Sequence, residues 1–388
     1  MTSAVDARLM AQALRLAERG LYTTDPNPRV GCVIARDGQV IAQAWHARAG
    51  EPHAEPLALE QAGPDARGAT VYVTLEPCCH HGRTPPCTEA LIKAGVARVV
   101  VAMQDPNPRV AGQGIAGLRA AGIEVDTGLM QDEALALNPG FVQRMQQGRP
   151  WVRSKLAMSL DGRTAMASGE SRWITGEAAR ADVQRLRARS SAIVTGIGTV
   201  LADDPRLNVR QLPDAAAAPD AIAPESRQPL RVVLDSQLRL PPTAQLLKVP
   251  GQLLVFTTQE PAHPHWPALE AAGAEVMQAS PSAEGRVDLG EVLRELAWRE
   301  CNEVLIEAGP VLAGAALQAG YIDELWLYWA PHLMGDAARG LFHLPGLECM
   351  DQRIGLELLE VRAVGNDCRL RLRPQPRPPQ RQESDSCV

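Results

Sequence analysis

Three residues that can bind a metal ion stand close to a carboxylate in the first quarter of the chain. His53 is followed two residues later by Glu55, and Cys78 and Cys87 come further along. One imidazole and two thiolates form a borderline-soft ligand set that suits Zn²⁺. Three protein ligands leave the fourth tetrahedral position open for water, which is typical of a catalytic zinc rather than a structural one.

Glu55 supplies the group that metal-assisted hydrolysis needs for proton transfer. Bound zinc lowers the pKa of its water towards about 7. A carboxylate two residues from a ligand can accept that proton and pass it to a leaving amine. We therefore predict a hydrolytic deaminase with His53, Cys78 and Cys87 as metal ligands and Glu55 as the catalytic residue.

A structural zinc module that only staples its loop is the alternative reading of these residues. It needs a fourth protein ligand, which three neighbouring residues can supply: Cys79, His80 and His81. Cys79 also competes with Cys78 as a ligand, and we favour Cys78 because it follows Pro77 directly. The structural reading leaves Glu55 without a role.

Asn27 lies just before a predicted hairpin. Its amide offers both a donor and an acceptor, which suits the amide-like edge of a pyrimidine. The simpler reading is a turn that leads into a strand, and the sequence leaves both open.

The second half carries features that suit phosphate groups. Gly309-Pro310 stands between a predicted strand and a helical run, and free N–H groups at a helix start bind anions. The glycine pair Gly196 and Gly198 lacks the third glycine of the dinucleotide fingerprint and is a weak signal. Arg187 and Arg210 can clamp a sugar phosphate, although either can equally be a solvated surface residue.

The elements that position these residues alternate between helix and strand, which predicts an α/β fold with helices covering a sheet. In the first half we expect helices at 6–19, 54–62, 88–94 and 114–121 and strands at 30–34, 40–45, 70–75, 97–103 and 123–125. In the second half we expect helices at 177–189, 287–300 and 314–319 and strands at 151–158, 192–195, 231–234, 253–257, 304–306 and 324–329. Thr175 is the expected N-cap of the helix at 177–189.

Composition limits the class of protein. The 388 residues suffice for two domains, and we place the boundary near Gly148. Residues 212–229 read as a surface loop, and residues 373–388 as a disordered tail. A net charge of −6 disfavours nucleic acid, and we expect no membrane span and no signal peptide, hence a cytoplasmic protein.

Longer motifs carry a resemblance to known families. The His-x-Glu and Pro-Cys pattern resembles the zinc-dependent cytidine/deoxycytidylate deaminases, with wider spacing between the cysteines. The stretches 24–31, 76–87 and 105–108 resemble the deaminase half of the bifunctional riboflavin-biosynthesis deaminase/reductase family. The stretches 155–163, 171–174, 196–199, 203–207 and 307–310 resemble its reductase half.

This resemblance implies a cytidine-deaminase-like three-layer domain at 1–148 and a dihydrofolate-reductase-like domain at 149–372. It implies hydrolytic deamination of 2,5-diamino-6-(5-phosphoribosylamino)pyrimidin-4(3H)-one, followed by NADPH-dependent reduction of the ribosyl to the ribityl side chain. The expected cofactors are one catalytic Zn²⁺ and NADPH. The expected partners are a small pyrimidine ribonucleotide and a second copy of the chain, a homo-oligomer.

The family pattern also implies binding residues. It places NADPH on Ala157, Trp173, Thr199, Asp203, Ser236, Gly309, Pro310, Val311, Leu312, Ala313, Gly314 and Ala315. It places substrate on Ser171, Arg187, Leu207, Arg210 and Glu307, in addition to Asn27 in the first half. No proton donor for the reduction is assigned, because a protein contributes mostly positioning to a hydride transfer.

Two rival functions remain open at this stage. One is a deaminase of free or nucleic-acid-embedded bases with an accessory reductase-like domain. The other is a non-catalytic zinc module that binds nucleotides as a scaffold. Activity on cytidine or tRNA would favour the first, and a zinc ion ligated by four protein groups would favour the second.

Overall fold

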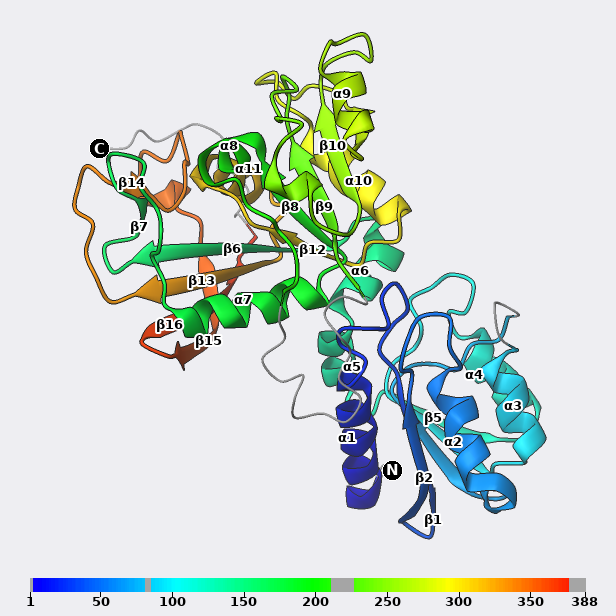
Figure 1. Ribbon diagram of the computed structural model, residues 1–388. Helices are drawn as coiled ribbons and strands as arrows, with labels where there is room; N and C mark the ends of the chain where they lie inside the picture. Colours follow the sequence, from blue (N-terminus) through cyan, green and yellow to red (C-terminus); the bar gives the residue numbers. More distant parts are fainter. Residues whose placement is uncertain (1–2, 81–84, 211–226, 377–388) are drawn as a thin grey trace, which may run out of the picture. The chain divides into compact units, whose positions relative to one another are not determined.

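The computed structural model describes residues 3–80, 85–210 and 227–376. The chain divides into two compact units (Figure 1). Unit 1 comprises residues 1–150 with 300–302, and unit 2 comprises residues 151–299 with 303–388. Most of the predicted loop at 212–229 and residues 377–388 of the predicted tail lie outside the described residues.

Unit 1 is built on a five-stranded sheet in the order β2-β1-β3-β4-β5. Its strands are β1 (Gly31–Arg36), β2 (Gln39–Trp45), β3 (Thr70–Val73), β4 (Arg98–Val101) and β5 (Glu124–Thr127). β1 runs antiparallel to β2 and β3, whereas β3, β4 and β5 run parallel. Asp37 and Gly38 both have positive φ in the predicted hairpin turn, as a turn that follows strand twist requires.

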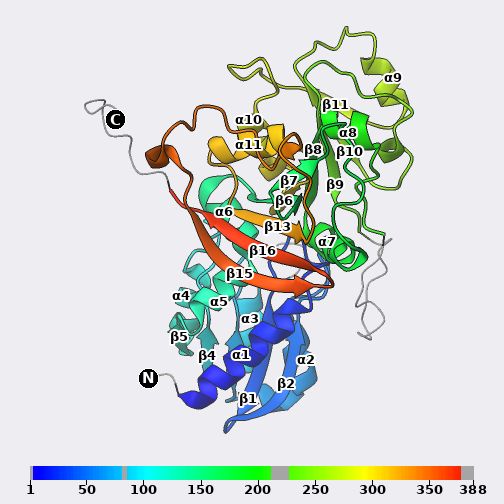
Figure 2. The ribbon, with the colours of Figure 1, turned by 90° about the vertical axis from the view of Figure 1, so that its left-hand side faces the viewer.

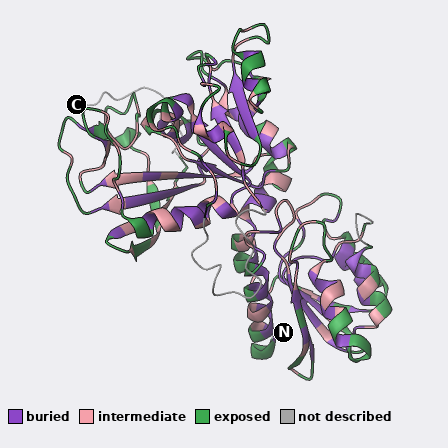
Figure 3. Ribbon diagram, in the orientation of Figure 1, coloured by how far each residue is buried: buried purple, intermediate pink, exposed green. Residues whose placement is uncertain are grey.

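Helices cover both faces of this sheet. They are α1 (Ala4–Glu18), α5 (Gln131–Leu137) and α6 (Pro139–Gln147) on one face and α2 (Ala54–Ala62), α3 (Cys87–Ala94) and α4 (Gln113–Ala120) on the other. Successive residues of a strand point to opposite faces of the sheet. Cys32 therefore packs in the core under α2, α3 and α4, and Val33 packs in the core under α1, α5 and α6. Figure 3 shows how fully the strands are buried between these layers. The predicted three layers are therefore present.

Unit 2 holds a nine-stranded sheet in the order β11-β10-β9-β8-β12-β6-β13-β16-β15. Its strands are β6 (Trp151–Ser159), β8 (Ala192–Gly196), β9 (Leu230–Leu234), β10 (Leu253–Thr257), β11 (Glu275–Gln278), β12 (Glu303–Ile306), β13 (Glu324–Ala330), β15 (Leu356–Val364) and β16 (Asp367–Pro374). The strands from β11 to β13 in this order are parallel, and β16 and β15 form an antiparallel edge (Figure 2). Separately, β7 (Arg163–Ala165) pairs with β14 (Arg339–Gly340).

The strand order places a crevice in this sheet. The chain runs outward from β8 to β11 and then returns, so that β12 lies between β8 and β6. Ligands of open α/β sheets bind beyond the carboxyl ends of strands at such a reversal. The helices around it are α7 (Glu177–Arg189), α8 (Ile197–Asp203), α9 (Trp266–Ala271), α10 (Leu289–Trp298) and α11 (Pro310–Gln318).

Some predicted element ends are wrong for identifiable reasons. Helix α7 is capped by Gly176 rather than Thr175, and the Gly176 N–H donates to Asp367 Oδ2 at 2.7 Å. Helix α11 starts four residues earlier than predicted, because Pro310 fits the first turn. Strand β16 continues through Arg373 and Pro374, which were assigned to the tail. None of the helices in the described residues combines the length and apolar character needed to cross a membrane.

Candidate active sites

The structure brings His53, Cys78 and Cys87 together in unit 1. Their possible ligand atoms all lie within 4.8 Å of one another. His53 Nδ1 is 3.2 Å from Cys87 Sγ and 3.6 Å from Cys78 Sγ. One nitrogen and two sulfurs at this separation fit a single zinc ion. Among the described residues no fourth protein ligand joins them, which leaves a position for a non-protein ligand.

Local structure fixes each of these three side chains. His53 is the N-cap of α2, and Cys87 is the first residue of α3. Cys78 lies in the loop that follows β3, where its carbonyl oxygen accepts hydrogen bonds from both the N–H and the hydroxyl of Thr88 at 3.2 Å. Two helix starts and the end of a strand thus converge on one point.

Hydrogen bonds prepare Cys78 to be a thiolate. The Cys87 thiol and the Cys87 N–H, which is 3.3 Å from Cys78 Sγ, both donate to it, and with His53 they lower the pKa of Cys78 to about 4. The same contact with Cys78 raises the pKa of Cys87. Thiolates are the form that binds zinc, so Cys78 is already prepared for the ion, whereas Cys87 must release its proton when the ion binds.

Glu55 lies in the first turn of α2, almost fully buried. Burial raises the pKa of its carboxyl to about 7, despite the opposing effect of His53. It also interacts with the Cys87 thiol. A carboxyl group that titrates near neutral pH beside the metal position is suited to accept and return a proton.

Asn27 reaches the metal cluster through a histidine that the sequence analysis missed. Asn27 Nδ2 is 3.1 Å from His46 Nε2, and His46 Nδ1 is 3.1 Å from the carbonyl oxygen of Pro52. The ring of His46 meets that of His53 edge to face, with centroids 5.3 Å apart. Asn27 also lies in a turn, as the simpler reading predicts, and its N–H donates to the carbonyl oxygen of Thr24 at 2.7 Å. Its contact with a pyrimidine stays a prediction. The only sequence signal for His46 was its place just after a strand.

The residues proposed for a fourth protein ligand are differently placed. Cys79 Sγ lies 3.9 Å from the carbonyl oxygen of Arg109 and does not join the cluster. His80 does not join it either, and His81 lies outside the described residues.

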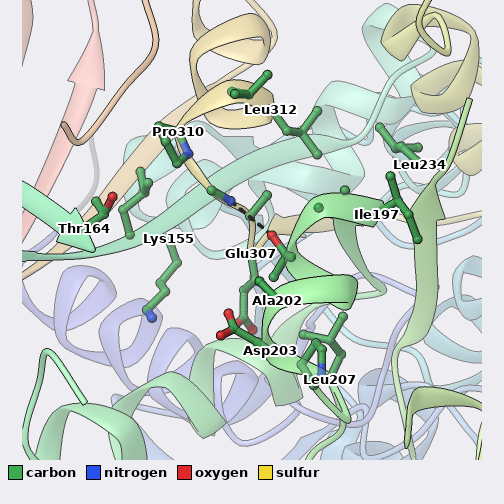
Figure 4. A pocket seen from close by; sticks show the side chains of 18 of the residues that line it. Lys155, Thr164, Ile197, Ala202, Asp203, Leu207, Leu234, Glu307, Pro310 and Leu312 are labelled. Atoms are coloured by element: carbon green, nitrogen blue, oxygen red, sulfur yellow. Dashed lines mark hydrogen bonds between the residues drawn. The ribbon is translucent and has the colours of Figure 1, made fainter. Parts of the chain in front are cut away.

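Unit 2 contains a cavity of about 1470 Å³ at the predicted crevice. It lies beyond the carboxyl ends of β8, β9 and β12, and residues 155–157 of β6 also line it. Figure 4 shows side chains from several of these segments around it, among them Lys155, Glu307 and Leu312. This volume exceeds the roughly 300–1,000 Å³ of pockets that hold one drug-sized ligand. A cofactor and a substrate can therefore share it.

Most of the residues proposed for NADPH and substrate line this cavity. They are Ala157, Ser171, Trp173, Arg187, Thr199, Asp203, Leu207, Arg210, Ser236, Glu307, Gly309, Pro310, Val311, Leu312 and Ala315. Ala313 and Gly314 do not line it. Ala313 is fully buried, and a Cβ on Gly314 would lie 2.1 Å from the carbonyl oxygen of His343. The structure therefore places these two on the packed face of α11 and not among the cavity residues.

Several cavity residues contact one another. The Gly309 N–H donates to Thr199 Oγ1 at 3.3 Å at the start of α11, and Ser171 Oγ donates to Asp203 Oδ1 at 3.5 Å. Arg187 forms two hydrogen bonds to Glu307, at 2.6 and 2.9 Å. The structure thus brings six of the predicted residues together in three pairs.

Positive charge gathers on one side of the cavity. Arg206, Arg210 and Lys155 line it with Arg187. Burial lowers the pKa of Arg210, and repulsion from Arg187 and Arg206 lowers it further. An anionic group would relieve this repulsion. The sequence analysis did not include Lys155 or Arg206 among the site residues, although both lie in stretches, 155–163 and 203–207, that resemble the reductase half of the family.

Two protein families match the chain. Residues 3–103 match the family described as the cytidine and deoxycytidylate deaminase zinc-binding region. Residues 150–370 match the family described as the RibD C-terminal domain. The matches confirm the predicted fold class, a cytidine-deaminase-like domain followed by a reductase domain.

Relatives match over nearly the full chain. The riboflavin biosynthesis protein RibD of Escherichia coli (strain K12) is 52% identical over 369 residues, which cover 95% of this chain and 99% of the relative. The solved structure of Acinetobacter baumannii RibD is 49% identical, with a TM-score of 0.87 and coverage of 96% and 99%. A deaminase/reductase structure from Thermotoga maritima is 32% identical, with a TM-score of 0.80 and the same coverage.

Proposed function

The chain belongs to the RibD family of bifunctional riboflavin-biosynthesis enzymes, and on this basis we propose how its residues divide the two reactions. The enzyme deaminates 2,5-diamino-6-(5-phosphoribosylamino)pyrimidin-4(3H)-one and then reduces the ribosyl to the ribityl side chain with NADPH. We assign the first reaction to unit 1 and the second to unit 2. The observation that carries this assignment is the open His53, Cys78 and Cys87 cluster beside buried Glu55.

In unit 1, His53, Cys78 and Cys87 hold the zinc ion, which when bound acts as a Lewis acid towards water. Glu55 accepts a proton from the attacking water and passes it to the amino group that leaves as ammonia. The Asn27 amide, oriented by His46, binds the polar edge of the pyrimidine ring.

In unit 2, conversion of ribosyl to ribityl breaks the bond between C1′ and the ring oxygen, adds a hydride at C1′ and adds a proton from solvent to that oxygen. NADPH, when bound, would supply the hydride. The first turn of α11 binds the cofactor phosphates through the N–H groups of Val311 and Leu312, because Pro310 has no N–H and the Gly309 N–H already donates to Thr199. Arg206 and Arg210, which line the cavity, bind the sugar phosphate of the substrate, and Trp173 and Ser236, which also line it, contact the cofactor.

The assignment to unit 1 is tested by ammonia release from the diaminopyrimidine substrate with zinc-loaded protein. Glu55→Gln should abolish release while the zinc content stays at that of the wild type. Glu89→Gln, on the exposed side of α3, is the matched control and should keep full activity. Unimpaired release by Glu55→Gln would remove Glu55 from the reaction.

We further propose a homo-oligomer that works in the cytoplasm. Edge strand β15 exposes three apolar side chains, those of Leu356, Leu358 and Val361. Exposed apolar edges are protected by pairing with another chain. The seven described cysteines are all free thiols, which suits a reducing compartment. Light scattering on the purified protein tests the assembly, and a monomer mass would contradict it.

A further inference from the structure

The Glu76 carboxylate is buried behind the metal-ligand loop and accepts three backbone hydrogen bonds. Oε2 accepts from the N–H of Asp105 at 3.1 Å and of Gly112 at 2.9 Å, and Oε1 accepts from the N–H of Ile115 at 3.1 Å. These contacts use the carboxylate only as an acceptor. An ionised carboxylate can meet three such donors, whereas a carboxamide has one acceptor oxygen and a donor group.

The three donors belong to the segment that follows the neighbouring strand β4. Glu76 comes shortly after the end of β3, and its own N–H donates to the carbonyl oxygen of Met103 at 3.0 Å. The parallel pairing of β3 and β4 brings both loops to the same edge of the sheet. Glu76 therefore ties the loop after β4 to the loop that carries Cys78.

Close packing shows that this segment has little freedom. A Cβ on Gly114 would lie 2.2 Å from the carbonyl oxygen of Pro77, so only glycine allows the observed approach. The Asp105 carboxyl lies near enough to the metal cluster to interact with Cys78, and it is itself buried. The segment from Asp105 to Ile115 thus forms a wall beside the metal-ligand loop.

We propose that Glu76 is a positioning residue of the deaminase site, which fixes the segment 105–115 as the wall that an approaching substrate meets. This inference rests on the proposed deamination in unit 1. Glu76 acts through the three amides and not through the metal, because its carboxylate oxygens are engaged by the segment. Loss of these bonds frees the wall and weakens substrate binding, while the metal ligands and Glu55 keep their places.

The test is Glu76→Gln in the full-length, zinc-loaded enzyme. The Gln side chain replaces one acceptor oxygen by an NH2 group, which would face a backbone N–H group of the segment. This loss should raise the KM for the diaminopyrimidine substrate about tenfold or more. The kcat of ammonia release should change less than about threefold. Zinc content and the visible spectrum of the cobalt-substituted protein should match the wild type, and amide hydrogen exchange should quicken in residues 105–115. Glu89→Gln is the matched control.

A second variant tests the same segment in case Glu76→Gln does not fold. Gly114→Ala keeps the Glu76 side chain but places a Cβ 2.2 Å from the Pro77 carbonyl oxygen and 3.2 Å from Glu76 Oε1, so it should displace the same segment and raise KM in the same way. An unchanged KM in both variants overturns the proposal. Loss of zinc or an altered cobalt spectrum in Glu76→Gln also overturns it, because Glu76 would then support the metal ligands rather than the substrate wall. A wild-type enzyme that releases no ammonia would instead refute the proposed function.

Discussion

Arg187 and Glu307 form a two-pronged ion pair in the wall of the unit 2 cavity, although 120 residues separate them in the sequence. Their side chains are only 11% and 10% exposed. Burial alone would raise the pKa of Glu307, but the Arg187 guanidinium holds it below its usual range. Glu307 is therefore a carboxylate at neutral pH, which can accept hydrogen bonds but has no proton to donate.

Breaking this pair from either side should impair the reduction. Arg187→Met and Glu307→Gln each leave the partner's polar groups unpaired and should each lower kcat/KM for NADPH oxidation about 100-fold. The kcat/KM of the double variant should fall by less than the product of the two single losses, which corresponds to a coupling free energy of about 2 kcal/mol. Arg185→Gln, on α7 but outside the cavity, is the control. Fully multiplicative losses would mean that the two residues act independently.

The pair also illustrates what the sequence could and could not provide. The sequence indicated the zinc ligands and Glu55 because few residue types can bind zinc or transfer a proton, and here they stand in recognisable motifs. It could not indicate that Arg187 binds Glu307 or that Asn27 contacts His46, because these contacts arise only when distant segments fold together. The motif from Gly309 to Ala315 was read as one continuous cofactor surface, but a helix turns Ala313 and Gly314 to its packed side.

Edge strands were equally hard to predict. In β16, arginines alternate with apolar residues, and the Pro/Arg-rich sequence beyond them resembled a tail. The structure shows why arginine is tolerated there: Arg369 and Arg371 both bind Glu360 on the neighbouring strand β15. These partners were not visible in a local pattern.

The zinc ligand set makes a prediction about adjacent cysteines. Cys78→Ser should lose most of the zinc, because it removes one of three protein ligands from the cluster. Cys79→Ser should retain one zinc per chain and most of the ammonia release, because its sulfur points to the Arg109 carbonyl oxygen. Metal analysis after dialysis checks this. Zinc loss in Cys79→Ser would reverse the assignment.

Gly314 should be intolerant of any side chain. Gly314→Ala places a Cβ against the His343 backbone and should cost about 2 kcal/mol, which lowers Tm by roughly 5 °C. Gly198→Ala, in α8 with no atom within 4 Å of the new Cβ, should leave Tm unchanged or raise it slightly. Thermal unfolding followed by circular dichroism compares the two. Equal Tm values would show that α11 can shift without cost.

The acid stability of unit 2 should depend on Asp182. Burial alone would raise its pKa, but the Tyr328 hydroxyl at 2.8 Å and Arg369 at 2.7 Å lower it. A lowered folded-state pKa stabilises the fold above the unfolded value of about 3.9, and the gain is lost as pH falls below it. Asp182→Asn should therefore lower the free energy of unfolding by about 3 kcal/mol at pH 7, and by progressively less below about pH 4. Urea unfolding at several pH values measures this, and a pH-independent loss would refute it.

The central claim is that two sites act in order on one substrate, and nicotinamide absorbance tests it most directly. Wild-type enzyme given the diaminopyrimidine phosphoriboside should oxidise NADPH, and Glu55→Gln should not. Both proteins should oxidise NADPH at the same rate when given the already deaminated pyrimidine. NADPH oxidation by Glu55→Gln with the diaminopyrimidine, or failure of either protein with the deaminated compound, would contradict the account.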